Sequence, residues 1–156
     1  MQAITPENTS SSRTEDADEK EVRAAIEDWL AAVRAKDTPR VLAHYAPDVI
    51  TFDIAPPFES RGRDAIKKRW EIWSASFDGP IGYRMDRLCL RVAGDAAFVH
   101  SINHITGRRR NGEHTDMYLR ATVGLRREQG RWLVVHEHVS VPIDMDTLRP
   151  LFGVRP

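Results

Sequence analysis

The segment RWLVVHEHVSVP, residues 131–142, is an apolar, β-branched run into which three titratable side chains are set. Successive side chains of a β-strand point to opposite faces, so both faces of this segment are mostly apolar. A strand of this kind lies centrally in a sheet and is covered on both sides. Glu137 then stands between Val135 and Val139, where a carboxylate must be paired, protonated or used in chemistry. One face carries Trp132, Val134, His136, His138 and Ser140, and the other carries Leu133, Val135, Glu137, Val139 and Val141.

The two-residue period of this segment extends back along the chain. Runs of strand composition alternate between the two faces, and short turns that contain glycine separate them. This pattern predicts an antiparallel meander that ends in the segment quoted above. The predicted strands cover residues 83–92, 96–107, 114–127 and 131–142.

Upstream of the meander, the apolar residues follow a helical period. A first helix is predicted over residues 18–36, where apolar side chains recur every three or four positions. Asp37 is typical of an N-cap, and a short second helix follows it. A brief strand over residues 49–54 and a third helix between Gly62 and Gly79 come next. Because the helices precede the meander instead of alternating with its strands, the order predicts an α+β fold.

The length and composition suit one globular domain. Lys plus Arg and Asp plus Glu number 23 each, so the chain of 156 residues has no net charge that would attract nucleic acid or an anionic membrane. Cys89 is the only cysteine, which excludes an intrachain disulfide. Because the sequence has neither an apolar signal segment nor a run long enough to cross a bilayer, we expect a cytoplasmic protein.

Three segments are predicted along the chain. Residues 1–17 are polar and almost free of apolar side chains, so we expect a disordered tail. Residues 18–142 are expected to form the folded domain. Residues 143–156 are expected to form a C-terminal extension that lies either across a cavity mouth or against a partner subunit.

The motifs of the folded domain resemble one known superfamily. The Asp37 cap, YAPD at residues 45–48, GRDAI at 62–66 and HEHVS at 136–140 resemble the nuclear transport factor two-like superfamily, in its SnoaL-like and ketosteroid-isomerase-like branch. The resemblance covers about residues 18–142. It implies a cone in which a curved antiparallel, or mixed, sheet wraps around three N-terminal helices and encloses an apolar cavity. It also implies a homodimer formed through the outer face of the sheet.

The resemblance further implies candidate catalytic residues. Asp53 stands where ketosteroid isomerase has its proton-shuttling aspartate, although it could instead only cap the exit turn of the strand. The match to the family places Glu137 in the cavity and turns His100 and His104 inward as acid or orienting groups. The oxyanion tyrosine of ketosteroid isomerase is replaced by Trp29, and its protonated aspartate has no counterpart. Both departures count against ketosteroid isomerase activity itself.

A set of apolar side chains is expected to line the cavity. Two tryptophans of the third helix share one stripe with the same spacing as core residues, so plain packing is the alternative to ligand binding. The predicted ligand-binding residues are Trp29, Trp70, Trp73, Phe98, Ile102, Val135 and Val139.

No metal and no cofactor is predicted. His100 and His104 are four residues apart on one strand, about 13 Å, which is too far for both to hold one ion. His136 and His138 could join His104 in a three-histidine site, but the family match turns them outward as hydrogen-bonded core or interface residues. The arginines at 108–110 are predicted to form a solvated hairpin tip, with an anion contact as the alternative.

These expectations combine into a functional hypothesis. The protein is predicted to bind a small, mostly apolar, carbonyl-bearing ligand in its cone and to move protons on it, by isomerisation, cyclisation or dehydration. The alternative is a dimeric module without catalytic activity that binds a ligand or mediates association.

Overall fold

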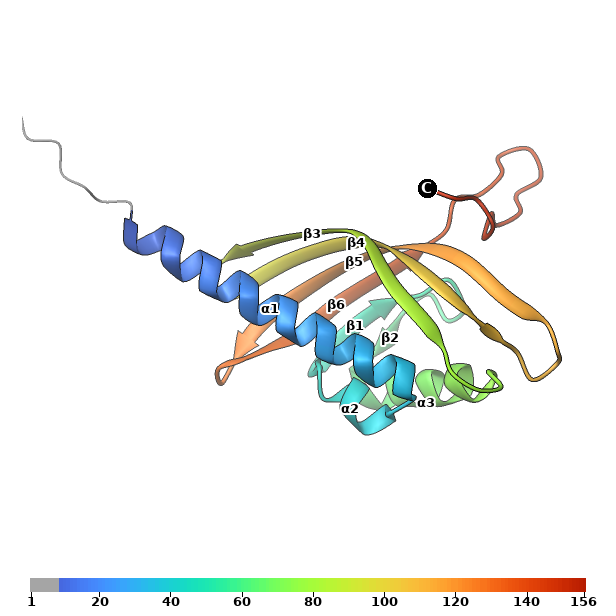
Figure 1. Cartoon of the computed structure of the whole chain (residues 1–156), viewed down its shortest axis with the longest axis horizontal. Helices are drawn as coiled ribbons and strands as arrows, with labels where there is room; N and C mark the ends of the chain where they lie inside the picture. The colour runs from blue at the N-terminus through green and yellow to red at the C-terminus, as the bar shows by residue number, and fades with distance from the viewer. Residues whose placement is uncertain (1–8) are drawn as a thin grey trace, which may run out of the picture.

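The computed structural model describes residues 9–156, with side chains from Asp16 onward. Six strands form one curved sheet in the order β2-β1-β6-β5-β4-β3. Strands β1 and β6 pair in parallel, and the other neighbours are antiparallel. Helix α1 crosses the sheet, and α2 and α3 lie together at one end of it (Figure 1). The elements are α1 (Thr9–Ala35), α2 (Thr38–Leu42), β1 (Tyr45–Phe52), β2 (Ser60–Arg61), α3 (Gly62–Ala75), β3 (Gly82–Ala93), β4 (Ala96–Arg108), β5 (His114–Glu128) and β6 (Arg131–Ser140).

This architecture confirms the predicted α+β fold with a curved mixed sheet. The four meander strands begin and end within about two residues of their predicted bounds. Asp37 is the N-cap of α2, where its side chain accepts a hydrogen bond from the Arg40 backbone N–H at 3.1 Å. Strand β1 starts earlier than predicted, at Tyr45, because its first residues pair with β6.

The first helix also starts earlier than the sequence predicts. We expected α1 from Asp18, but it begins at Thr9, so residues 9–17 of the predicted tail are helical and the predicted boundary falls inside α1. Extending a helix that already exists adds one backbone hydrogen bond per residue, even where no apolar side chain is buried. Residues 1–8 of the predicted tail lie outside the described residues.

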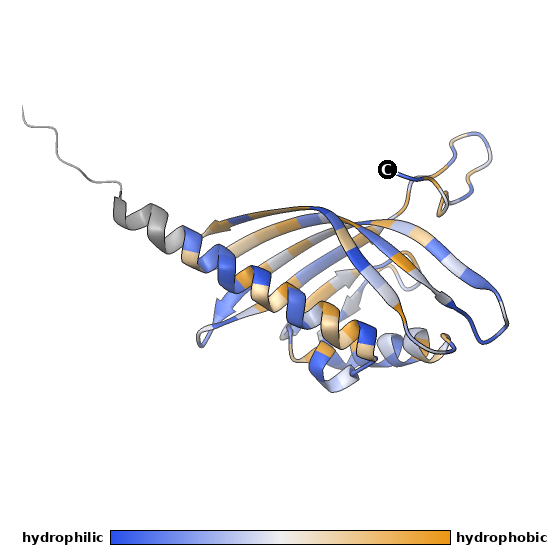
Figure 2. Ribbon diagram, viewed as in Figure 1, coloured by the Kyte–Doolittle hydropathy of each residue, from blue (hydrophilic) through white to orange (hydrophobic). Residues whose placement is uncertain are grey.

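Helix α1 packs its apolar side against the sheet. Polar and apolar residues alternate along it (Figure 2), and Val22, Trp29 and Val33 are buried. Near its N-terminus, Asp18 forms an ion pair with Arg127 of β5, and the Arg127 guanidinium lies 4.7 Å from the Trp132 ring centroid. These contacts fix the N-terminal half of α1 over β5 and β6.

A β-bulge in β6 changes which of its side chains face the interior. Gly124 of β5 pairs with His136 and Leu125 pairs with Val134, so Val135 is an extra residue between them. A strict alternation would turn Trp132 and Val134 outward, but the bulge turns them toward α1, on the same side as Glu137. The predicted cavity position of Val135 is therefore wrong, because the bulge interrupts the two-residue period at that residue.

Candidate functional site

The sheet, α1 and α3 enclose a cavity of about 660 Å³. A smaller hollow of about 40 Å³ lies deeper between α1 and the sheet, and Trp29, Tyr45 and Glu137 line both spaces. The wall of the large cavity is mostly apolar and aromatic, with a few polar side chains, as is usual for small-molecule sites. The polar or charged side chains that line it are Tyr45, Thr51, Asp53, Arg69, Ser76, Tyr83, Arg109 and Glu137.

Glu137 is the less exposed of the two carboxyl groups that line the cavity. It comes from the centre of β6 and lies beside Thr51 of β1 and Val123 of β5. The Tyr45 hydroxyl donates a hydrogen bond to Glu137 Oε2 at 3.0 Å. Burial raises the pKa of Glu137 from 4.5 to about 7, and the Asp53 carboxylate adds to the rise, while Tyr45 and Arg69 oppose it. At neutral pH both protonation states of this carboxyl are therefore accessible.

Tyr45 is buried, with 4% of its surface exposed, at the start of β1. Burial and the neighbouring Glu137 carboxyl raise the pKa of Tyr45 well above its ordinary value, although the nearby Trp29 indole opposes part of the rise. Its hydroxyl therefore keeps its proton and acts as a donor to the Glu137 carboxylate.

Asp53 lies at the cavity wall just beyond β1, as the resemblance implies. It forms an ion pair with Arg69 of α3. Arg69 also donates hydrogen bonds to Thr51 Oγ1 (3.4 Å) and Ser60 Oγ (3.1 Å). The arginine therefore links α3 to the β1 end of the cavity and compensates the negative charge beside Glu137.

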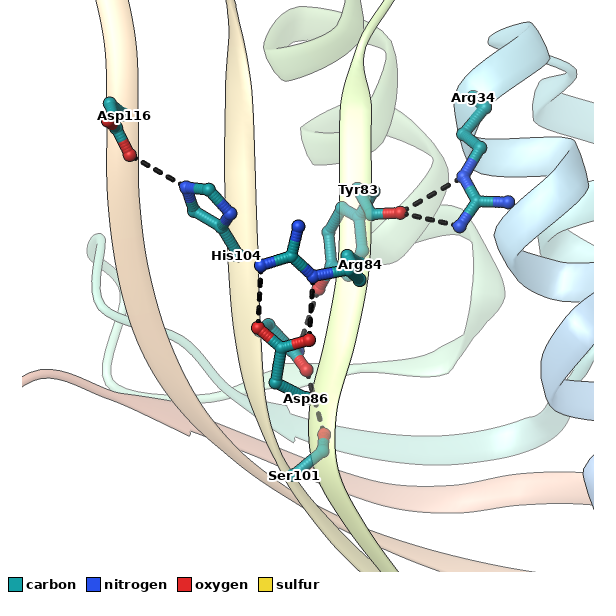
Figure 3. A network of polar contacts seen from close by, with 8 residues as sticks. Arg34, Tyr83, Arg84, Asp86, Ser101, His104 and Asp116 are labelled. Atoms are coloured by element: carbon teal, nitrogen blue, oxygen red, sulfur yellow. Dashed lines mark hydrogen bonds and ion pairs between the residues drawn. The ribbon is translucent and has the colours of Figure 1, made fainter. Parts of the chain in front are cut away.

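A second buried tyrosine, Tyr83, also lines the cavity. Tyr83 Oη accepts a hydrogen bond from Asn103 Nδ2 at 2.8 Å, and the Ser101 hydroxyl donates to Asn103 Oδ1 at 2.7 Å. Arg34 of α1 donates to the Tyr83 backbone carbonyl, which fixes the start of β3 (Figure 3). Burial raises the pKa of Tyr83, so its hydroxyl stays protonated. Because Asn103 uses the oxygen as acceptor, the Tyr83 proton is directed elsewhere and has no acceptor among the described residues.

The three tryptophans predicted to bind ligand all line the cavity. Trp29 packs edge to face on Tyr83, with ring centroids 5.3 Å apart, and Trp70 and Trp73 contact each other on α3 at 4.9 Å. Within the described residues, the indole N–H groups of Trp29 and Trp70 are buried without a hydrogen-bond partner. A buried donor without an acceptor is costly, so a polar atom of a ligand or a bound water is expected to supply one.

Strand β4 faces the opposite way from our prediction. Its interior side chains are those of Ala97, Val99, Ser101, Asn103 and Ile105. Phe98, His100, Ile102 and His104 lie on the outer face of the sheet, so none of the four lines the cavity. The family match set the strand one residue out of phase, and in a strand such a slip exchanges the two faces.

The histidines thus lie on the outer face of the sheet. His104 contacts Asp116 at 2.7 Å (Figure 3) and stacks on Tyr118 at 4.3 Å. His136 and His138 also point outward, as predicted, and both contact Phe52 of β1. Among residues 16–156, no three His, Cys, Asp or Glu side chains are grouped so that they could hold a metal ion.

The C-terminal extension contributes to the cavity wall. The Tyr118 backbone N–H donates to the Phe152 carbonyl at 3.1 Å, and the Phe152 side chain lines the cavity beside Met117 and Val139. At least one residue of the extension therefore takes part in the cavity wall.

Of the polar or charged side chains that line the cavity, the sequence predicts only Asp53 and Glu137. The six that it does not predict are Tyr45, Thr51, Arg69, Ser76, Tyr83 and Arg109. Tyr45 and Tyr83 stand at strand starts, where a tyrosine reads as ordinary core. Arg69 lies one residue before Trp70 on α3, and this position next to the apolar stripe was the one available signal that it reaches the cavity. Arg109 was assigned to a hairpin tip, although the end of β4 turns its side chain back over Phe77.

Comparison with known proteins gives results that agree with this geometry. The sequence profile of the SnoaL-like domain matches residues 22–144. No curated protein matches the chain. Among solved structures, an NTF2-like protein of unknown function from Pseudomonas putida KT2440 is 38% identical, with a TM-score of 0.82, over 90% of this chain and 98% of that chain.

Two more distant structures share the fold alone. An NTF2-like family protein from Streptomyces avermitilis, provisionally named a dehydratase, is 19% identical over 81% of this chain and 97% of that chain, with a TM-score of 0.72. A ketosteroid isomerase-like protein from Erwinia carotovora atroseptica is 22% identical over 78% of this chain and 93% of that chain, with a TM-score of 0.67. Within the described residues no helix is long and apolar enough to span a membrane.

Proposed function

This chain belongs to the SnoaL-like domain family, and on that premise we propose that it is an acid–base enzyme that moves a proton at a carbon next to a carbonyl group. The observation that carries the proposal is Glu137, whose carboxyl faces an aromatic cavity and has a pKa of about 7. A general base works best when its pKa lies near the working pH. The ligand is a small, flat, mostly apolar ketone or aldehyde, and isomerisation, cyclisation and dehydration all suit these groups.

Each polar group then has a role. The Glu137 carboxylate takes a proton from carbon, and the resulting carboxylic acid returns it to the same or another carbon. The Tyr83 hydroxyl and the Trp29 indole N–H donate to the carbonyl oxygen, where negative charge develops. Asp53 was the predicted base, but because it is paired with Arg69 we assign it an electrostatic role beside Glu137.

The proposal is tested with β-tetralone, a flat ketone with acidic protons next to its carbonyl. We expect the protein to accelerate exchange of these protons for deuterium in D₂O, followed by proton NMR. Because the carboxylate form is the base, kcat/KM should rise with pH through a midpoint near 7. The exposed Glu113→Gln variant is a control that should behave as wild type. Binding without exchange at any pH would instead favour the ligand-binding module considered above.

We also propose that two copies of the chain associate through the outer face of the sheet. Phe98 of β4 is 51% exposed and Phe52 of β1 is 38% exposed on this face, where His100, His136 and His138 also lie. Because the bulge turns Trp132 and Val134 toward α1, Phe52 and Phe98 are the apolar side chains that support association through this face.

Light scattering at micromolar concentration is expected to give twice the chain mass. Phe98→Glu places a charge on the proposed contact and should yield a folded monomer. Met145→Glu, which changes an exposed apolar residue of the C-terminal extension, should remain dimeric. A wild-type chain that scatters as a monomer would refute the proposed interface.

A further inference from the structure

At the end of the cavity away from Glu137, the Arg109 guanidinium lines the wall with Ser76. Its Nε donates to Thr115 Oγ1 at 2.7 Å, and its Nη1 donates to Ser76 Oγ. The guanidinium lies over the buried Phe77 ring, with 3.9 Å between Cζ and the ring centroid. Each of these contacts is with a neutral group, so the positive charge is held in position but not neutralised.

No carboxylate forms an ion pair with Arg109 among residues 16–156. The other cavity arginine, Arg69, is paired with Asp53, but Arg109 has no carboxylate within 4.0 Å. Glu113 lies on the same hairpin, and its carboxylate accepts a hydrogen bond from Asn111 at 2.8 Å. Burial lowers the pKa of Arg109, and the charge of Glu113 opposes only part of the fall, as expected for a cation that loses water without a contacting anion.

The C-terminus of α3 points toward this end of the cavity, and its carbonyl groups would oppose an anion there. One of these carbonyls is already bound to a cation, because Ala75 O accepts from Arg110 Nε at 2.6 Å. Just beyond the helix, Phe77 O accepts from Lys36 Nζ at 2.8 Å. These two cations offset part of the negative charge at the end of α3.

From this arrangement we propose that the ligand carries a carboxylate, which binds to Arg109 while its carbonyl group lies at Glu137. Ser76 positions the guanidinium, because its own hydroxyl proton is donated to Trp73 O at 2.6 Å. An arginine fork recognises a carboxylate through two parallel hydrogen bonds, and three of the five Arg109 donors are unused by the described residues. Arg69 and Ser76 are seven positions apart along α3, which corresponds to about 10 Å of helix. The substrate class is thus a keto acid with its two polar groups at opposite ends of an apolar body. This inference rests on the proposed function.

The test compares two probes of equal shape, para-acetylphenylacetate and its neutral amide, by isothermal titration calorimetry. In each probe a ketone and the second polar group lie on opposite sides of an aromatic ring. Because a hydrogen bond to a charged group is stronger than one to a neutral group, we expect wild-type protein to bind the carboxylate about tenfold more tightly than the amide. Equal affinities, or no binding of either probe at millimolar concentration, would overturn the proposal.

Variants test whether the preference for the carboxylate probe depends on Arg109. Arg109→Gln should abolish the tenfold difference, whereas Arg109→Lys, which keeps the charge, should retain part of it. Arg108→Gln is the matched control, because Arg108 is the preceding residue, is exposed and does not line the cavity. A carboxylate preference that persists in Arg109→Gln would also refute the assignment.

The outcome is distinguishable from failure of the proposed function. Exchange of β-tetralone tests Glu137 with an uncharged ligand, and the two probes test Arg109 by binding alone. Exchange without a carboxylate preference would refute this inference and leave the acid–base function standing. A carboxylate preference without exchange of β-tetralone would refute the acid–base function and leave the assignment of Arg109 as the carboxylate-binding residue standing.

Discussion

Replacing Glu137 by Gln is expected to abolish proton exchange and, at the same time, to make the protein more stable at pH 8. The amide has nearly the same shape as the carboxyl group but cannot take up a proton from carbon. Loss of a general base costs about 100-fold or more in rate. The gain in stability distinguishes this carboxyl from one that is retained for packing.

The sign of the stability effect follows from the raised pKa. The folded protein holds a proton on Glu137 up to about pH 7, whereas the unfolded chain releases it near 4.5. Between these values the folded state binds more protons, so stability falls as pH rises through this window. A shift of this size corresponds to about 3 kcal/mol, of which Gln should recover about 2 kcal/mol because its amide must still be buried.

Thermal melts at two pH values provide the measurement. At pH 8 the Glu137→Gln variant should melt about 5 °C above wild type, and at pH 4 it should melt about 3 °C below wild type, because only the cost of burying the amide remains. Asp53→Asn is the comparison, since it breaks the ion pair with Arg69 and is expected to lower stability at pH 8. A Glu137→Gln variant that is several kcal/mol less stable than wild type at pH 8 would identify Glu137 as a structural ion-pair partner.

The order of the elements could be predicted because local signals agree with the tertiary structure. The Asp37 cap, the helical stripe of α3 and the glycine turns of the meander each act within a few residues. The parallel pairing of β1 with β6 involves residues far apart in sequence, and no local signal in Tyr45–Phe52 announces it. The order of helices and meander predicted the α+β class, and the resemblance supplied the curved mixed sheet.

The faces of the strands were harder to predict than the strands themselves. Glu137 and Val139 line the cavity, because both follow the bulge. Val135 sits at the bulge, and a single extra residue there reverses the phase of Trp132 and Val134. In β4 the sequence does not indicate which face is interior, since both faces carry apolar residues.

The polar site was only partly predictable for a related reason. Glu137 could be identified because a carboxylate in an apolar strand stands out against its neighbours. Tyr45 and Tyr83 do not stand out, because a tyrosine in a strand is common core composition. Their roles depend on hydrogen bonds to Glu137 and Asn103, residues that are distant in sequence.

Replacing Tyr83 by Phe is expected to reduce the exchange rate of β-tetralone about 100-fold, which is the usual cost of removing one donor from a developing oxyanion. The pH midpoint near 7 should not move, because Tyr83 makes no hydrogen bond to Glu137. Stability should fall by about 1–3 kcal/mol, since the Asn103 amide, 1% exposed, loses the acceptor for its N–H.

Replacing Tyr45 by Phe is the matched control, because it removes a hydroxyl at the other tyrosine of the same cavity. Tyr45 donates to the Glu137 carboxylate and so favours its ionised form. Its loss should move the pH midpoint of exchange upward and leave the high-pH rate within about tenfold of wild type, since the Tyr83 donor remains. The two phenylalanine variants therefore separate the roles, because loss of the Tyr83 hydroxyl should lower the exchange rate at high pH and loss of the Tyr45 hydroxyl should raise the pH midpoint of exchange. If Tyr83→Phe moved the pH midpoint and left the high-pH rate unchanged, the carbonyl-binding role would have to be assigned to Trp29 and Tyr45 instead.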